Sequence, residues 1–264
     1  MHAEGSGVRP VKRPPPSLTL RVRCAIFAFA MAALTIVWAM ISLLTVVLPL
    51  HTRFYVISRW NVTVSWLLKA IIGLDYRIEG TQNIPDTPCI LFCKHESAWE
   101  TIILPIHFAP QTWVLKRELL WLPFFGWGLA LLAPIAINRN SATNALQQVI
   151  DKGRDRLARR MWVVIFPEGT RVSPGSRKRY KRGGASLAAA TGTPVLPIAV
   201  NSGDFWGRNS FIKYPGTIDL VVGPLIQTDG LNAEQICRQA EQWIEGTVQR
   251  LRTPTPAPAP APAR

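Results

Sequence analysis

Residues 162–171 read Trp-Val-Val-Ile-Phe-Pro-Glu-Gly-Thr-Arg, a short apolar run that ends directly in a polar turn. The same arrangement occurs at 89–101, where the apolar run Cys89–Cys93 is followed by Lys-His-Glu-Ser-Ala-Trp-Glu-Thr. Short apolar runs of this kind are typical of buried strands in a parallel sheet. Because such sheets present reactive side chains at the carboxyl ends of their strands, both polar turns are candidates for a functional site.

From Tyr76 onward, short apolar runs alternate with longer stretches of helical periodicity. This pattern predicts an α/β domain with a mostly parallel central sheet flanked by helices. Asn232 and Gln235 are spaced like a capping box, which predicts that a last amphipathic helix begins there and continues to Leu251. The clearest expected strands are Cys89–Cys93, Trp162–Phe166, Val195–Val200 and Ile218–Val222, and the clearest other helices are Ser141–Arg160 and Gly184–Thr191.

A membrane-embedded segment of two helices, residues 24–75, is predicted ahead of this domain. Residues 24–50 carry no charged side chain. As a helix they would be about 40 Å long, more than the roughly 30 Å of bilayer hydrocarbon. A signal peptide is the alternative, but the run is too long for its apolar region and no small-residue cleavage site follows Leu50. Residues 54–75 are apolar enough to return through the membrane or to lie in it.

The flanking segments indicate how the chain is oriented. Residues 1–23 are rich in Pro and Gly and carry five Lys or Arg, so we expect a flexible basic arm that stays in the cytoplasm. A hairpin of two helices then leaves residues 76–252, the expected α/β domain, on the cytoplasmic side of the cytoplasmic (inner) membrane. Residues 253–264, with Pro at every second place, are expected to form an extended tail.

Composition favours lipid over nucleic acid as the anionic partner. The chain has 30 Lys and Arg against 16 Asp and Glu, a net charge of +14, which suits either kind of partner. A hydrophobic fraction of 48% with 10 Trp is unlike most nucleic-acid binders. Tyr180 is the one aromatic residue in the basic run 177–182, whereas nucleic-acid binding would need several. We therefore expect a membrane lipid surface as partner and no nucleic acid.

The cysteine spacing does not indicate a disulfide framework or a metal site. Buried free thiols in a reducing compartment are expected instead. Zinc binding by Cys89 and Cys93 would need two further ligands, and the nearest histidine, His95, has another expected role. No metal and no cofactor is predicted. The four cysteines are Cys24, Cys89, Cys93 and Cys237.

His95 is the first candidate for chemistry. It follows the expected strand 89–93, and a helix that begins near Glu96 would place Glu100 about one turn further on. The carboxylate would then hold one imidazole nitrogen and leave the other to accept a proton from a hydroxyl. An ordinary histidine at a strand end beside a solvated glutamate is the alternative, and on spacing alone it is the commoner outcome.

The second candidate is the turn at 169–171. Gly169 lets the backbone approach a ligand closely, Thr170 offers a hydroxyl, and Arg171 offers a bidentate fork suited to phosphate. A plain turn with a surface arginine is the alternative. Lys116 and Arg139, from the segment between the two turns, add positive charge.

Neither turn supplies a nucleophile of a known protease or esterase type. His95-Glu96 is not followed by a second His three residues on, as a zinc protease requires, and no Gly-x-Ser-x-Gly occurs. The attacking hydroxyl is therefore expected to come from the substrate.

These motifs resemble those of the lysophosphatidic acid acyltransferases (1-acylglycerol-3-phosphate O-acyltransferases) of the glycerolipid acyltransferase family. The resemblance covers roughly residues 50–225 and runs through four blocks in the family's order. His95 and Glu100 match the first block, with Glu where the family usually has Asp, and residues 166–171 match the third without change. The second block is matched by Lys116–Leu119, Pro123, Gly126 and Ile137–Arg139. Tyr180–Gly183 match the positions that follow the third block, and Val195–Val200 match the fourth block.

The resemblance implies transfer of an acyl group from acyl-CoA or acyl carrier protein to the sn-2 hydroxyl of 1-acyl-glycerol-3-phosphate, giving phosphatidic acid without a cofactor. His95 would be the base and Glu100 its orienting carboxylate. An acyltransferase for another lyso-lipid, such as lyso-ornithine lipid or a lysophospholipid, and a non-catalytic lipid-binding protein are the alternatives. The residues expected to bind the phosphate and the acceptor are Lys116, Arg139, Glu168, Gly169, Thr170 and Arg171.

Overall fold

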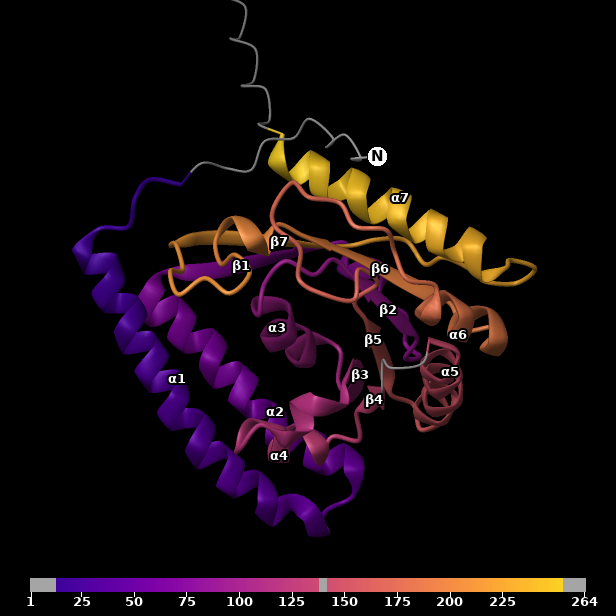
Figure 1. The fold of residues 1–264 in the computed structure, drawn as a ribbon, viewed down its shortest axis with the longest axis horizontal. Coiled ribbons are helices and arrows are strands. Elements are labelled where there is room, and N and C mark those ends of the chain that lie inside the picture. Colours follow the sequence, from indigo (N-terminus) through magenta and orange to yellow (C-terminus); the bar gives the residue numbers. More distant parts are fainter. Residues whose placement is uncertain (1–12, 138–141, 254–264) are drawn as a thin grey trace, which may run out of the picture.

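A seven-stranded sheet organises the protein (Figure 1). The computed structural model describes residues 13–137 and 142–253. Within them the strand order is β1-β7-β6-β2-β5-β3-β4, and neighbouring strands are parallel except for β6 with β7. The strands are β1 (Leu74–Glu79), β2 (Ile90–Cys93), β3 (Gln111–Lys116), β4 (Ile135–Ile137), β5 (Trp162–Ile165), β6 (Val195–Val200) and β7 (Gly216–Val222).

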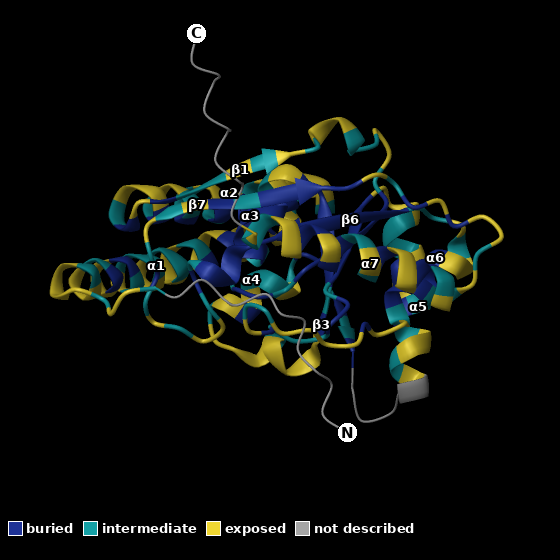
Figure 2. Ribbon diagram, turned by 90° about the horizontal axis from the view of Figure 1, so that it is seen from above, coloured by how far each residue is buried: buried dark blue, intermediate teal, exposed yellow. Residues whose placement is uncertain are grey.

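Helices cover both faces of the sheet (Figures 1 and 2). Side chains alternate along β2, so that Leu91 and Cys93 pack into a core with α1, α2 and α3, whereas Ile90 and Phe92 pack into a core with α5, α6 and α7. Successive side chains of this central strand therefore enter the two cores in turn. The helices are α1 (Leu18–Leu44), α2 (Leu50–Leu67), α3 (Trp99–His107), α4 (Phe125–Ala130), α5 (Ala142–Ala158), α6 (Gly183–Thr191) and α7 (Ala233–Arg252).

The predicted α/β domain with its mostly parallel sheet and flanking helices is confirmed. β6 has the expected bounds, and β2, β5 and β7 differ from expectation by one or two residues. β1, β3 and β4 were not among the expected strands. β1 lies at one edge of the sheet with charged residues at alternate positions, and β4 at the other edge is three residues long, so neither forms the apolar run by which the buried strands were found.

The first helix begins earlier than predicted. The Ser17 hydroxyl accepts a hydrogen bond from the Leu20 N–H at 3.2 Å and caps α1. Residues 18–23 are therefore helical and not part of a flexible arm. Residues 1–12 of the expected arm and 254–264 of the expected tail lie outside the described residues.

A proline divides the apolar run that was expected to form one helix. Pro49 disfavours helical backbone at Leu48, which is extended with φ −84° and ψ 150°. The next helix, α2, starts at Leu50, and its last turn is π-helical and ends at Ile72. Because β1 then starts at Leu74, the sheet domain begins two residues before the expected position 76.

The outer side of α1 is apolar and exposed. The most apolar window of the segment Leu18–Val47 has a mean hydropathy of 2.4 and is 17% buried, and among the described residues this segment alone is long and apolar enough to cross a membrane. α1 contacts α4, and exposed aromatic side chains near that contact include Trp121 and Trp127. Figure 2 shows exposed residues along α1 and at the neighbouring loops. The N-terminal helices thus present an apolar surface beside the sheet domain.

Two local predictions are also confirmed. Asn232 and Gln235 form a capping box at the start of α7, since each side chain accepts a hydrogen bond from the other's N–H at 2.9 Å. All four cysteines are buried free thiols.

Candidate active site

The carboxyl ends of β2 and β5 bring the two polar turns together. These strands are parallel neighbours, with Phe92 beside Ile165. The Val172 N–H donates to the His95 carbonyl oxygen at 2.9 Å. The ring of His95 stacks on that of Phe166, with 3.9 Å between centroids and 19° between planes. Two motifs that are distant in sequence therefore form one site.

His95 and Glu100 make the contact that their spacing predicts. Nδ1 of His95 lies 3.2 Å from Oε2 of Glu100, which is fully buried on the first turn of α3. Because this contact occupies Nδ1, Nε2 is the nitrogen that remains for a substrate in the cavity that His95 lines.

The start of α3 accommodates the longer side chain of Glu100. Its carboxylate folds back over the helix start and accepts hydrogen bonds from the N–H groups of Glu96 at 3.2 Å and Ser97 at 3.1 Å. The Ser202 hydroxyl also donates to it. A negative charge is favourable here because of the helix dipole. These donors fix the carboxylate beside the imidazole at the position where the resemblance in sequence implied the shorter Asp.

Glu168 does not line the cavity, contrary to its expected role in acceptor binding. Its side chain is fully buried, and Oε2 accepts a hydrogen bond from the His95 N–H at 2.9 Å. Oε1 lies 2.7 Å from Nζ of Lys94, which in turn lies 2.7 Å from Oε1 of Glu245 on α7. A buried carboxylate needs such partners, and these hold Glu168 beneath the site, where it supports the backbone of His95.

Burial shifts the ionisation of this cluster. It raises the pKa of Glu168 to about 7, an effect that the charge of Lys94 opposes. Burial lowers the pKa of Lys94, but the charges of Glu168 and Glu245 outweigh it, and the pKa is raised. The Tyr180 hydroxyl donates to Oε1 of Glu245 at 3.1 Å. Lys94 is therefore a cation shared by two buried carboxylates.

A cavity of 840 Å³ lies in front of His95. The helices α1, α2 and α4 contribute apolar side chains to its wall, among them Trp38, Ile57 and Leu129. Loops at the end of the sheet contribute basic side chains, including Arg171. A lining of this kind suits an amphipathic ligand that joins an anionic group to a long apolar chain.

Most of the expected binding residues line this cavity. Lys116, Thr170 and Arg171 do so, as does Gly169. Gly169 has a φ of +69°, and a Cβ there would lie 2.9 Å from Cε of Lys181, so that a larger residue would be strained and would displace that lysine. Arg139 lies outside the described residues.

Three further residues of the site were not identified from sequence. Lys181 and Arg208 line the cavity, but Lys181 was noted only as part of the basic run 177–182 and Arg208 lies in no motif. Ser202, which donates to Glu100, follows the end of β6. The rule that pointed to His95, that reactive side chains follow strand ends, applies equally to Ser202.

Comparison with known proteins shows to which family this chain belongs. Residues 75–201 match the family model described as Acyltransferase. A 1-acyl-sn-glycerol-3-phosphate acyltransferase of Pseudomonas aeruginosa is 41% identical over 232 residues, which cover 86% of this chain and 90% of that protein. This chain belongs to the 1-acyl-sn-glycerol-3-phosphate acyltransferase family. A member from Cocos nucifera is 28% identical over 83% of this chain and 71% of its own length.

The fold is also that of this family. The crystal structure of the 1-acyl-sn-glycerophosphate acyltransferase PlsC from Thermotoga maritima matches with a TM-score of 0.74, over 91% of this chain and 98% of that one, at 21% identity. The N-terminal helices and the sheet domain thus correspond to a known architecture.

The buried lysine should be essential for stability. Lys94→Met is expected to lower the free energy of unfolding by about 3–5 kcal/mol, because Glu168 and Glu245 lose their common cation inside the protein. Denaturant unfolding of the purified protein in detergent measures this loss.

Lys69→Met is the matched control. Lys69 also lies 2.7 Å from a carboxylate, that of Asp75, but its side chain is 66% exposed. Solvent screens such a pair, so little change in stability is expected. Similar losses for the two variants would show that burial does not determine the contribution of Lys94.

Proposed function

We propose that the protein transfers an acyl group from a thioester to the sn-2 hydroxyl of 1-acyl-glycerol-3-phosphate and so produces phosphatidic acid. The observation that carries this proposal is the contact of His95 with Glu100 beside a cavity with apolar and basic walls. Membership in the family supports the choice of acceptor, since the Pseudomonas aeruginosa relative is named for this activity.

The transfer requires one general base. Nε2 of His95 accepts the proton of the sn-2 hydroxyl while the hydroxyl oxygen attacks the carbonyl carbon of the thioester. The tetrahedral intermediate then collapses, the carbon–sulfur bond breaks, and the leaving thiolate takes the proton from the imidazolium. Glu100 holds Nδ1, orients the ring and stabilises its charged form during the reaction.

Basic side chains of the cavity are proposed to bind the acceptor phosphate. Arg171 presents a planar fork that matches a phosphate oxygen pair, and Lys116, Lys181 and Arg208 line the same cavity. Arg139 remains a candidate from the sequence. Such a basic lining favours a phosphate-bearing acceptor over a lyso-ornithine lipid, which has no phosphate.

The apolar surface of α1 and α4 is proposed to lie in the cytoplasmic membrane. Its support is the exposed apolar length of α1 and the exposed tryptophans Trp121 and Trp127, because tryptophan favours the boundary between lipid and water. The same helices line the cavity, so an acceptor and its acyl chain would enter from the lipid. We place the catalytic domain on the cytoplasmic side, as the basic N-terminal segment favours.

Expression in cells that lack their own lysophosphatidic acid acyltransferase tests the proposed function. The wild-type protein is expected to restore growth and phosphatidic acid. His95→Ala should lower turnover by about 10²–10⁴-fold, since it removes the base. Glu100→Asp should retain more activity than Glu100→Gln, because it keeps a carboxylate for Nδ1. Absence of phosphatidic acid despite good expression of the wild type would contradict the proposal, and full turnover by Glu100→Gln would contradict the role of Glu100.

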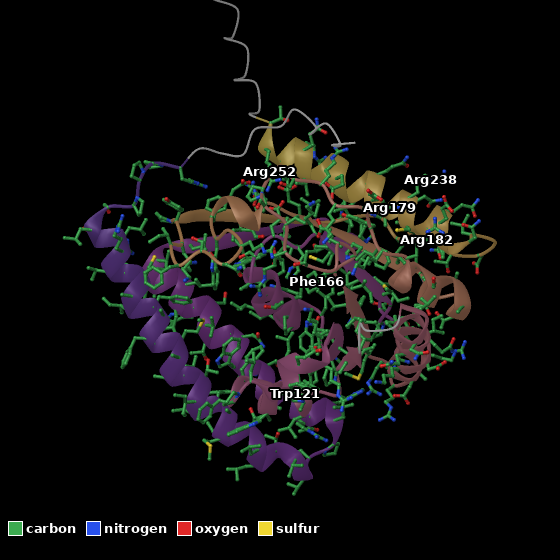
Figure 3. All side chains as sticks on the ribbon, in the orientation of Figure 1. Trp121, Phe166, Arg179, Arg182, Arg238 and Arg252 are labelled. Carbon is green, nitrogen blue, oxygen red and sulfur yellow. The ribbon has the colours of Figure 1, made fainter. Side chains whose placement is uncertain are left out.

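The acyl donor is proposed to be acyl carrier protein, which docks on an exposed basic surface. This basic surface consists of Arg177, Lys178, Arg179 and Arg182 on the loop before α6, with Arg238 of α7. In Figure 3 the labelled members lie at α6 and α7, far from Trp121 on the apolar side. A basic surface that points away from the apolar surface suits an acidic soluble protein better than a bilayer.

Reversal of one charge on the basic surface tests whether acyl carrier protein is the donor. Arg179→Glu is expected to raise the KM for acyl carrier protein donors about tenfold and to leave the KM for acyl-CoA unchanged, because it places a like charge against an acidic partner. Arg154→Glu on the exposed side of α5 alters the net charge equally and is the control. Equal effects of Arg179→Glu on both donors would rule out a docking surface for the carrier protein.

A further inference from the structure

The residues on either side of His95 point away from the cavity. Side chains of β2 alternate between the two cores, and the alternation continues past the strand end. His95 lies on the side of α3, whereas Lys94 and Glu96 are buried on the side of α7, which they contact through ion pairs. The catalytic pair and its neighbours are thus held from opposite faces of the sheet.

Helix α7 makes these two ion pairs with residues two turns apart. Glu245 contacts Lys94 with 2.7 Å between Oε1 and Nζ. Arg252, about 10 Å further along the helix, contacts Glu96 with 2.5 Å between its terminal nitrogen and Oε2. The side chains of Arg252 and Glu96 are 3% and 0% exposed, and Arg252 lies at the end of α7 in Figure 3. Helix α7 therefore forms ion pairs with the residues on both sides of His95.

Arg252 is also connected to Glu100, through the turn formed by residues 202–204. Nε of Arg252 lies 2.9 Å from Oδ2 of Asp204. Oε2 of Glu96 also accepts a hydrogen bond from the Gly203 N–H at 3.3 Å, and Ser202 in the same turn donates to Glu100. Arg252 thus fixes both the segment that carries His95 and the turn that holds its orienting carboxylate.

We infer that Arg252 is a positioning residue for acyl transfer, which acts through Glu96 and Asp204 to hold His95 and Glu100 at reactive distance. The inference rests on the proposed function of the His95 site. Arg252 contacts neither the cavity nor the catalytic pair directly. α7 also lies beyond residues 75–201, which match the family model.

The expected effect is a loss of turnover without a loss of binding. Arg252→Met should lower kcat about 100-fold, the effect of a shift of about 1 Å in a catalytic group. The KM for 1-acyl-glycerol-3-phosphate should change little, because the basic residues that bind the phosphate are not held by Arg252. Arg252→Lys keeps the charge and should recover part of the turnover. Arg250→Met, an exposed arginine on the same turn of α7, is the matched control and should match the wild type.

A triple variant that lacks all three charges distinguishes a loss of stability from a displacement of His95 and Glu100. Arg252→Met alone leaves the carboxylates of Glu96 and Asp204 buried without their cation, which lowers the melting temperature. Glu96→Gln, Asp204→Asn and Arg252→Met together remove all three charges, so the melting temperature should recover while kcat stays low. Recovery of kcat together with the melting temperature would overturn the inference, as would wild-type kcat in folded Arg252→Met.

Hydrogen exchange tests the same inference without a substrate. Arg252→Met should speed exchange of the amides at 95–97, because their segment is released, whereas Arg250→Met should not. Unchanged exchange at 95–97 in Arg252→Met would overturn the inference. This measurement does not depend on the identity of the acceptor, so its outcome is separate from that of the proposed function, which fails if the wild type transfers no acyl group to 1-acyl-glycerol-3-phosphate.

Discussion

The strict alternation of side chains at the end of β2 is the constraint on which the site depends. Residues 94–96 directly follow the strand. Because side chains alternate between the two faces of the sheet, His95 faces the cavity, whereas Lys94 and Glu96 face the opposite side. Each of the two buried charges then requires a partner of opposite sign. α7 supplies both partners, so the helix that closes the far face of the sheet also fixes the segment that carries the imidazole.

The two sides of the sheet differ in the surfaces that they expose. The side with α1, α2 and α4 forms an exposed apolar surface and much of the cavity wall, where a lipid acceptor would be held. The side with α5, α6 and α7 carries the buried ion pairs and an exposed basic surface. The strand ends, where the two motifs meet, belong to both, and α5 and α6 complete the cavity wall with residues such as Val149 and Gly184. Under the proposed function, a membrane-bound acceptor would approach His95 from the apolar side and a soluble donor from the basic side.

The sequence predicted what depends on local pattern. The buried strands, the capping box of α7 and the pairing of His95 with Glu100 all follow from spacing within a short segment. The α1 boundary was wrong because a serine cap and a proline outweigh apolarity.

What the sequence did not reveal concerns contacts between distant segments. The resemblance implied that Glu168 binds the acceptor, yet its partners in the structure are Lys94 and the His95 amide, more than seventy residues earlier. Arg252 looks like an ordinary basic residue at a helix end, which the dipole favours, and its pairing with Glu96 is visible only once α7 is packed on the sheet. The most direct test of the account is a structure of the protein in a lipid nanodisc with bound 1-acyl-glycerol-3-phosphate. We predict the sn-2 oxygen within about 3.2 Å of His95 Nε2, with the phosphate against Arg171. A bound acceptor whose hydroxyl faces away from His95, with its phosphate outside the basic lining of the cavity, would contradict it.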